Sequence, residues 1–84
     1  MFYVYVLKSL KDNNLYFGST NDLRRRLSDH NLGKVRSTKG RVPLELKYFE
    51  AYSKEKDARA RESSLKKDGR ALAQLKKRIS ESLQ

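Results

Sequence analysis

Apolar and polar side chains alternate in three segments of the chain, which is the period expected of half-buried β-strands. These segments are residues 2–8 (FYVYVLK), 15–19 (LYFGS) and 44–52 (LELKYFEAY), and a polar turn at residues 12–14 separates the first two. In the third segment, Leu44, Leu46 and Tyr48 are expected to share one face. The pattern predicts a hairpin and a third strand that returns beside it.

Any register that joins the apolar faces of the hairpin places Tyr3, Tyr5 and Leu7 on the opposite face, together with Tyr16 and Gly18. Pairing Val6 with Phe17, for example, places Gly18 opposite Tyr5. Tyr16 then lies diagonal to Tyr5, within reach of an aromatic side chain. We therefore expect the two phenols to converge on the opposite face of the hairpin, with Gly18 leaving an open space between backbone and solvent.

Helical spacing accounts for most of the remaining chain. One helix is expected from a cap at Thr20 or Asn21 to about residue 30 or 31, one over about 54–67 with a cap at Ser53, and one over about 70–82. A basic loop is expected over residues 31–43. The predicted buried positions are Leu23, Leu27, Ala58, Leu65, Leu72, Leu75, Ile79 and Leu83. The sequence therefore predicts an α/β (α+β) fold over residues 1–84 as a single domain, with helices around a three-stranded antiparallel sheet.

The net positive charge of the chain indicates what kind of molecule the protein binds. The chain has 20 Lys and Arg against 10 Asp and Glu, a formal net charge of +10. A small domain this basic is expected to meet a polyanion such as DNA, RNA or an acidic membrane surface. The densest cluster comprises Arg24, Arg25, Arg26, Lys34, Arg36, Lys39 and Arg41. For any one of these residues, a solvated surface position is the simpler interpretation.

Residue types that are rare or missing exclude several kinds of site. There is no cysteine, so neither a disulfide nor a cysteine zinc site is available, and the single histidine excludes a multi-histidine metal site. No segment approaches the ~20 apolar residues needed to span a bilayer. The first residues alternate like a strand and lack a basic region before their apolar run, so they are not interpreted as a signal peptide. We expect a cytoplasmic protein that does not contact a membrane.

Three polar residues occupy unusual positions on the predicted helices. Arg26 and His30 are four residues apart and form a second stripe at the edge of the core. Glu62 lies between Ala58 and Leu65 in helical spacing, where an apolar residue is expected. A buried carboxylate is costly unless it is paired or binds a metal. Glu62 is therefore a metal ligand, a member of an ion pair with Arg59, Arg61 or Lys66, or a hydrated residue on a loosely packed helix.

Two tripeptides stand in the predicted hairpin, Tyr3-Val4-Tyr5 and Tyr16-Phe17-Gly18. Arg26 follows ten residues after Tyr16, His30 comes one helical turn later, and Glu62 lies far downstream. In this order and spacing, the features resemble those of the GIY-YIG nuclease superfamily, and most closely its small standalone members. The resemblance covers essentially the whole chain, although Tyr3 replaces the name-giving glycine and Phe17 the isoleucine.

The resemblance implies a metal-dependent endonuclease that hydrolyses phosphodiester bonds, in structure-directed DNA processing or repair. The implied catalytic residues are Tyr5, Tyr16, Arg26, His30 and Glu62. Glu62 would hold a single Mg²⁺ or Mn²⁺ ion, and Tyr16 would orient or deprotonate the attacking water. Arg26 would offset charge at the phosphate, Tyr5 would position water or phosphate, and His30 would contact phosphate or relay a proton.

The expected partner is nucleic acid, DNA more than RNA, with an unidentified protein partner left open. Arg24, Lys34, Arg36, Lys39 and Arg41 are expected to hold its backbone without reading sequence. Two other classes of function stay open. One is a nucleic-acid-binding module of the same fold without efficient turnover, and the other is a structural or protein-interaction domain whose charge serves solubility.

Overall fold

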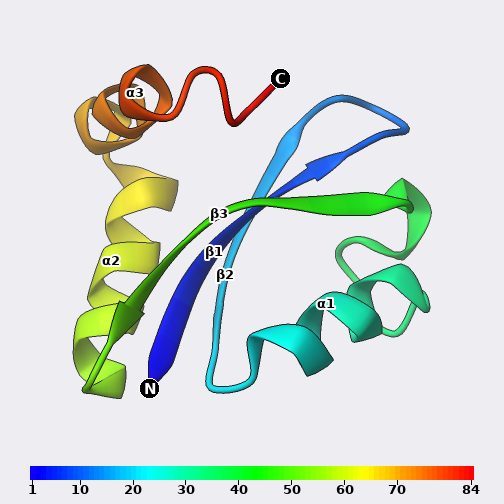
Figure 1. The fold of residues 1–84 in the computed structure, drawn as a ribbon, viewed down its shortest axis with the longest axis horizontal. Helices are drawn as coiled ribbons and strands as arrows, with labels where there is room; N and C mark the ends of the chain where they lie inside the picture. Colours follow the sequence, from blue (N-terminus) through cyan, green and yellow to red (C-terminus); the bar gives the residue numbers. More distant parts are fainter.

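The computed structural model describes residues 1–84 and contains one three-stranded antiparallel sheet with helices against both faces (Figure 1). Its strands are β1 (Phe2–Ser9), β2 (Leu15–Thr20) and β3 (Leu44–Tyr52), in the order β2-β1-β3. Its helices are α1 (Leu23–Asn31), α2 (Glu55–Lys67) and α3 (Gly69–Arg78), with a short 3-10 turn η1 at Lys39–Arg41. The predicted fold is confirmed. None of the helices combines the length and the apolar character that crossing a membrane requires.

The first helix begins at a different cap from the one predicted. Asp22, and not Thr20 or Asn21, occupies the capping position of α1. Its carboxylate accepts a hydrogen bond from the backbone N–H of Arg25 at 3.1 Å. A carboxylate is favoured there because it satisfies a free N–H group and complements the positive end of the helix dipole.

The two later helices also differ from their predicted limits. The cap of α2 is Lys54, without a side-chain hydrogen bond, so the predicted cap at Ser53 is wrong. Two acidic residues in the first turn supply the negative charge that favours this helix end. The helix α3 ends at Arg78 and not near residue 82, because Ile79 leaves helical geometry. Leu83 nevertheless packs against the core, so the predicted contact survives the loss of the last helical turn.

The sheet separates two hydrophobic clusters. The face covered by α2 and α3 carries the larger cluster, formed by Val4, Val6, Ala58, Leu65, Leu75 and Ile79. The opposite face carries Tyr5, Leu7 and Leu44, against which Leu23 and Leu27 of α1 pack. In Figure 1, α2 and α3 accordingly lie to one side of the strands and α1 to the other. The central strand β1 is therefore buried on both faces.

The third strand does not keep a regular alternation. Val6 pairs with Tyr48 and Leu7 with Leu46, so Lys47 is an extra residue in β3. Leu46 consequently packs on the face of α1, whereas Tyr48 packs on the face of α2. The prediction that Tyr48 shares a face with the leucines is wrong, because this bulge reverses the side-chain direction after it.

Gly18 lies opposite Tyr5 and Phe17 opposite Val6, which is one of the registers that join the apolar faces of the hairpin. The space beside Gly18, however, is filled. A Cβ atom at residue 18 would lie 2.4 Å from the hydroxyl oxygen of Tyr5 and 2.6 Å from its Cζ atom. The prediction of an open space is therefore wrong, because the Tyr5 ring packs directly on the glycine backbone.

Replacing Gly18 by alanine should destabilise the fold, because the added methyl group forces the buried Tyr5 ring to move. We expect a loss of about 2 kcal/mol in the free energy of unfolding, typical of overpacking in a core. Gly40→Ala is the matched control, since a Cβ atom there meets nothing within 4 Å. Urea denaturation of both variants tests this. Equal stability of the two variants would show that the Tyr5 ring does not need the glycine.

Candidate active site

A buried chain of hydrogen bonds joins three segments that are distant in the sequence. The hydroxyl of Tyr5 in β1 shares a hydrogen bond of 2.8 Å with Nε2 of His30, near the end of α1. On the other side of the imidazole, Nδ1 shares a bond of 2.7 Å with Oγ1 of Thr38, just before η1. All three residues are buried. The chain therefore ties the first helix and the basic loop to the central strand.

The surroundings of these three hydrogen-bonded residues keep the His30 imidazole neutral. Burial and, to a smaller extent, the nearby positive charge of Arg26 lower the pKa of His30 to about 4. Burial raises the pKa of Tyr5, while the Arg26 guanidinium beside it acts in the opposite direction. At neutral pH the imidazole thus donates through one nitrogen and accepts through the other. Both nitrogens are already engaged, so His30 supports Tyr5 and does not face solvent.

Tyr16 forms an aromatic group with Tyr5 and His30, on the solvent side of their hydrogen bond. Its ring centroid lies 5.0 Å from that of His30 and 6.4 Å from that of Tyr5. Its hydroxyl accepts a long hydrogen bond of 3.4 Å from Oγ of Ser37. Tyr16 is half-buried, whereas Tyr5 is buried. The predicted convergence of the two phenols is observed, and Tyr16 is the one within reach of solvent.

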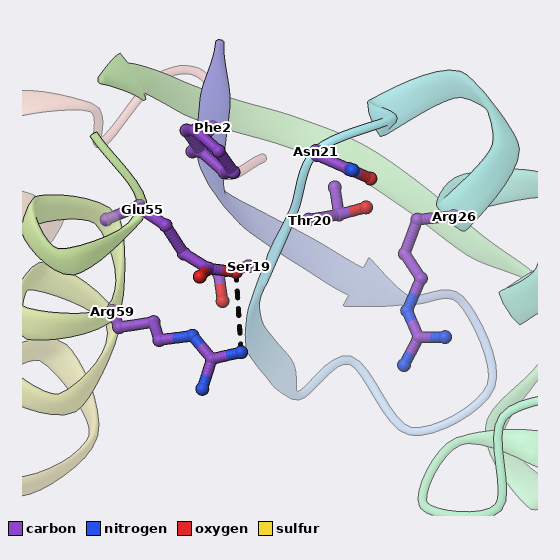
Figure 2. Close-up of a pocket in the computed structure, with 8 residues that line it drawn as sticks. Phe2, Ser19, Thr20, Asn21, Arg26, Glu55 and Arg59 are labelled. Atoms are coloured by element: carbon purple, nitrogen blue, oxygen red, sulfur yellow. Dashed lines mark hydrogen bonds and ion pairs between the residues drawn. The ribbon is translucent and has the colours of Figure 1, made fainter. Parts of the chain in front are cut away.

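Arg26 lies where two polar hollows meet. One hollow, of about 300 Å³, is lined by Phe2, Ser19, Thr20, Asn21, Arg26, Glu55, Ala58 and Arg59. The other, of about 480 Å³, is lined by Thr20, Asn21, Asp22, Arg25, Arg26 and Asp29. Figure 2 shows the Arg26 side chain on one flank of the first hollow and the Arg59 side chain on the other, with Ser19 between them. An arginine therefore lies on each side of the turn from β2 to α1, Arg26 from α1 and Arg59 from α2.

Glu62 reaches the same strand from the opposite face of the sheet. Its Oε1 atom accepts a hydrogen bond of 2.6 Å from Oγ of Ser19 in β2, and its Oε2 atom pairs with Nζ of Lys66 at 2.7 Å. Burial raises the pKa of Glu62, but the hydrogen bonds and positive charge of Lys66, aided by Ser19, outweigh it and hold the pKa below its usual range. The side chain is 20% exposed and ionised at neutral pH. Of the three predicted ion-pair partners, Lys66 is the one observed.

Lys66 links Glu62 to the aromatic group. Its ammonium nitrogen, bound to Glu62, also lies 5.9 Å from the centroid of the Tyr16 ring. Tyr16 points to one face of the edge strand β2, and Glu62 of α2 contacts the other face. The Lys66 side chain reaches from one to the other around this edge of the sheet. The structure thus gathers Tyr5, Tyr16, Arg26 and His30 on one face and brings Glu62 to the same corner of the molecule.

The predicted nucleic-acid-binding residues fall into two groups. Arg24, Lys34, Arg36 and Lys39 are exposed. Arg41 is instead half-buried: its Nε pairs with Asp12 at 2.7 Å, and its Nη2 donates to the carbonyl oxygen of Asn14 at 3.0 Å. Arg41 therefore ties the basic loop to the hairpin turn.

Four further residues contribute to this site: Ser19, Ser37, Thr38 and Lys66. The sequence indicates only Lys66, as a possible ion-pair partner of Glu62. Lys66 lies four residues after Glu62, a spacing that predicts an ion pair on a helix. Ser19, Ser37 and Thr38 meet their partners only through tertiary contacts. No local signal in the sequence marks these three.

Glu62 is the carboxylate that this corner places beside the aromatic group, through Lys66. No group of three or more His, Cys, Asp or Glu side chains is arranged to hold a metal ion. Mg²⁺ keeps several waters and is commonly bound by one or two carboxylates together with substrate phosphate. The ionised, partly exposed Glu62 fits that kind of site once Lys66 releases its Oε2 atom.

Comparison with known proteins places the chain in a family. A family model described as the GIY-YIG catalytic domain matches residues 1–79. The chain is 46% identical over 68 residues to a UPF0213 protein of Clostridium perfringens, across 80% of this chain and 72% of that protein. It is 41% identical over 69 residues to a UPF0213 protein of Streptococcus agalactiae, across 81% of this chain and 77% of that protein.

A solved structure agrees with these relatives. The solution NMR structure of a UPF0213 protein from Bacillus halodurans aligns with a TM-score of 0.54 and 36% identity. The alignment covers 89% of this chain and 82% of that one. The chain therefore belongs to the GIY-YIG family, whose catalytic domain is that of nucleic-acid endonucleases that generally depend on a divalent metal.

Proposed function

We propose that this protein is a cytoplasmic, divalent-metal-dependent endonuclease that cuts DNA at particular structures, as in DNA processing or repair. The observation that carries this proposal is that Tyr16 and Arg26 flank the buried Tyr5–His30 pair, while Lys66 connects the Tyr16 ring to the ionised Glu62 across the edge of the sheet. Hydrolysis of a phosphodiester needs an oriented water and stabilisation of charge on the phosphate and leaving oxygen. This corner offers groups for each task, within a single domain of residues 1–84.

Each side chain is assigned a role from its surroundings. Tyr16, the more accessible phenol, would orient the attacking water or take its proton. Arg26, between the two polar hollows, would contact the phosphate and offset charge that develops there. Tyr5 is buried, so it would hold Arg26 and Tyr16 in position from beneath and would not itself contact the phosphate. His30 is neutral and buried, so we assign it the positioning of Tyr5 in place of direct contact with phosphate.

Glu62 would hold one Mg²⁺ or Mn²⁺ ion, which when bound neutralises charge on the phosphate and helps the leaving oxygen depart. Ser19 already orients the Oε1 atom of this carboxylate. Lys66 occupies the Oε2 atom in the resting protein and must release it.

The backbone of the nucleic acid would lie across the exposed basic residues Arg24, Lys34, Arg36 and Lys39. We add Arg59, which lines the same hollow as Arg26 and whose exposed guanidinium makes only a long ion pair of 3.4 Å with Glu55. We leave out Arg41 because its guanidinium is half-buried and bound to Asp12 at 2.7 Å and to the carbonyl oxygen of Asn14 at 3.0 Å. Such contacts bind phosphate without reading sequence, and they weaken as salt rises.

A binding module without turnover is the second candidate function. The observation that favours it is the double engagement of Glu62 by Ser19 and Lys66, which is also how a purely structural carboxylate would be satisfied. Measuring cleavage separately from binding distinguishes the two functions.

Glu62→Ala should abolish cleavage of branched, duplex or single-stranded DNA in the presence of Mg²⁺ or Mn²⁺. We expect a loss of at least about 100-fold in single-turnover rate, typical of groups that stabilise transition-state charge. Stability should fall by no more than about 1 kcal/mol, because a partly exposed ion pair contributes little. Glu81→Ala, an exposed acid near the C-terminus, is the control. Cleavage at the parent rate contradicts the mechanism, and a much lower melting temperature identifies Glu62 as a structural residue.

Lys66→Gln should tighten the binding of a divalent ion in the absence of nucleic acid. The variant removes a positive charge that lies 2.7 Å from the Glu62 carboxylate, so an incoming cation meets less competition and repulsion. We expect affinity for Mn²⁺ to rise by about tenfold, measured by titration calorimetry. Lys67→Gln makes the same change in net charge at the next, exposed residue and should have little effect. Equal affinities of the two variants for Mn²⁺ would show that Lys66 does not compete with the metal ion for the Glu62 carboxylate.

The neutral state of His30 should make stability depend on pH. The pKa of His30 is lowered from 6.5 to about 4, so between these values the unfolded chain binds a proton that the folded protein does not. Stability is therefore fully present above pH 6.5 and falls as the pH drops, by about 2 kcal/mol between pH 7 and pH 5 for this group alone. His30→Gln retains groups that can hydrogen-bond and lacks this titration, so its stability should fall less over that range. Urea denaturation at pH 7, 6 and 5 measures the difference, and parallel pH profiles would contradict it.

A further inference from the structure

Part of the sheet face that carries the Tyr5 cluster is left uncovered by α1. The helix packs on the half of that face formed by Tyr5, Leu7 and Leu44. Tyr3 and Phe49 lie on the same face, at the edge of this cluster, and neither is a member of either hydrophobic core. Phe49 is 49% exposed, and its ring meets that of Tyr3 edge to face with centroids 5.9 Å apart. Two aromatic rings therefore stand together on an open surface.

This aromatic pair is continuous with the proposed active site. Phe49 pairs with Tyr5 across β3 and β1, and Tyr5 pairs with Gly18 across β1 and β2. Neighbouring strands lie about 4.8 Å apart, so Phe49 is roughly 10 Å from the strand that carries Tyr16. Tyr3 pairs with Thr20, which lines both polar hollows beside Arg26. The pair thus adjoins the two polar hollows that Arg26 lines on one side and the phenols on the other.

Charge decides which occupant suits this surface. The net charge of +10 makes a second copy of the chain a poor partner, because like-charged molecules repel. A nucleic-acid strand combines phosphates, which the arginines attract, with flat bases, which stack on aromatic rings. Bases inside a duplex are stacked on each other and cannot reach a protein ring, so only unpaired bases fit.

We propose that Tyr3 and Phe49 form a platform on which one or two unpaired bases stack while Arg26 holds a neighbouring phosphate. This inference rests on the proposed function and specifies its substrate class as nucleic acid with an unpaired segment beside the bond to be cut. Stacking on aromatic rings tolerates any base, so the platform selects the structure of the substrate and not its sequence.

Binding of labelled oligonucleotides to the full chain without divalent metal tests the platform, because no cleavage occurs under these conditions. Fluorescence anisotropy would compare a single strand of ordinary nucleotides with a strand of the same length and charge that carries abasic sites. The parent should bind the ordinary strand about tenfold more tightly than the abasic strand, the size expected for stacking of one or two bases. Phe49→Ala should lose most of that preference while its affinity for the abasic strand is unchanged.

Two further variants make the result specific. Phe49→Trp should keep or increase the preference, whereas Leu10→Ala should leave it unchanged, since Leu10 is equally exposed, at 50%, but lies in the hairpin turn at the far end of β1. Thermal melting checks that each variant folds. The platform is overturned if the parent binds both strands equally, or if Phe49→Ala keeps the preference. It is also overturned if Phe49→Ala changes only self-association, measured by light scattering.

Failure of the platform and failure of the nuclease proposal give different results. Glu62→Ala should keep the preference for ordinary over abasic strands, since Glu62 lies on the other face of the sheet. If cleavage depends on Glu62 but the preference is absent, the platform fails and the nuclease remains. If the preference is present and no cleavage occurs, the platform belongs to a binding module.

Discussion

The hydrogen bond between the hydroxyl of Tyr5 and Nε2 of His30 is the contact on which the rest of the site depends. It holds the end of α1 against the central strand, and through Thr38 it also holds the basic loop. Arg26 lies one helical turn before His30, so fixing the imidazole also fixes where that guanidinium can reach. The bond in turn requires Gly18, because only a residue without a Cβ atom leaves room for the Tyr5 ring.

A second polar cluster has the same effect on the other face of the sheet. Glu50 in β3 accepts hydrogen bonds from the hydroxyls of Tyr48 and Tyr52 and pairs with Arg61 of α2 at 3.0 Å. Arg61 precedes Glu62, so this cluster anchors α2 next to the proposed metal ligand. The hydroxyls of Tyr48 and Tyr52 therefore also help to place a carboxylate.

Buried polar groups at both clusters are satisfied, as low dielectric surroundings require. No buried side-chain nitrogen or oxygen lacks a hydrogen-bond partner. Removing one member of such a cluster would leave its partner unpaired in an apolar environment, which costs more than the bond itself contributes. This protein therefore keeps its uncompensated positive charge at the surface, where it is free to attract phosphate.

Much of the fold and part of the site follow from the sequence alone. Alternation and residue type predict the three strands, and any register that joins the apolar faces of the hairpin puts Tyr5 and Tyr16 on one face, where they are observed to meet. Helical spacing brings Arg26 and His30 to one stripe and marks Glu62 as a polar residue at a core position. These features depend on residues that are close in the sequence or joined by a single short turn. The local sequence pattern is therefore sufficient to predict them.

The tertiary structure decides the features that depend on contacts between distant segments. The bulge at Lys47 turns Tyr48 to the opposite face, and the Tyr5 ring fills the space beside Gly18. The same holds for the chain from His30 to Thr38 and for the contact of Ser19 with Glu62, 43 residues apart. Periodicity assigns a residue to a face of its own element, but it carries no information about which side chain of another element meets it there. The sequence thus determines which residues bear the chemistry, and packing of the two helical layers on the sheet determines which of them are buried, paired or open to a substrate.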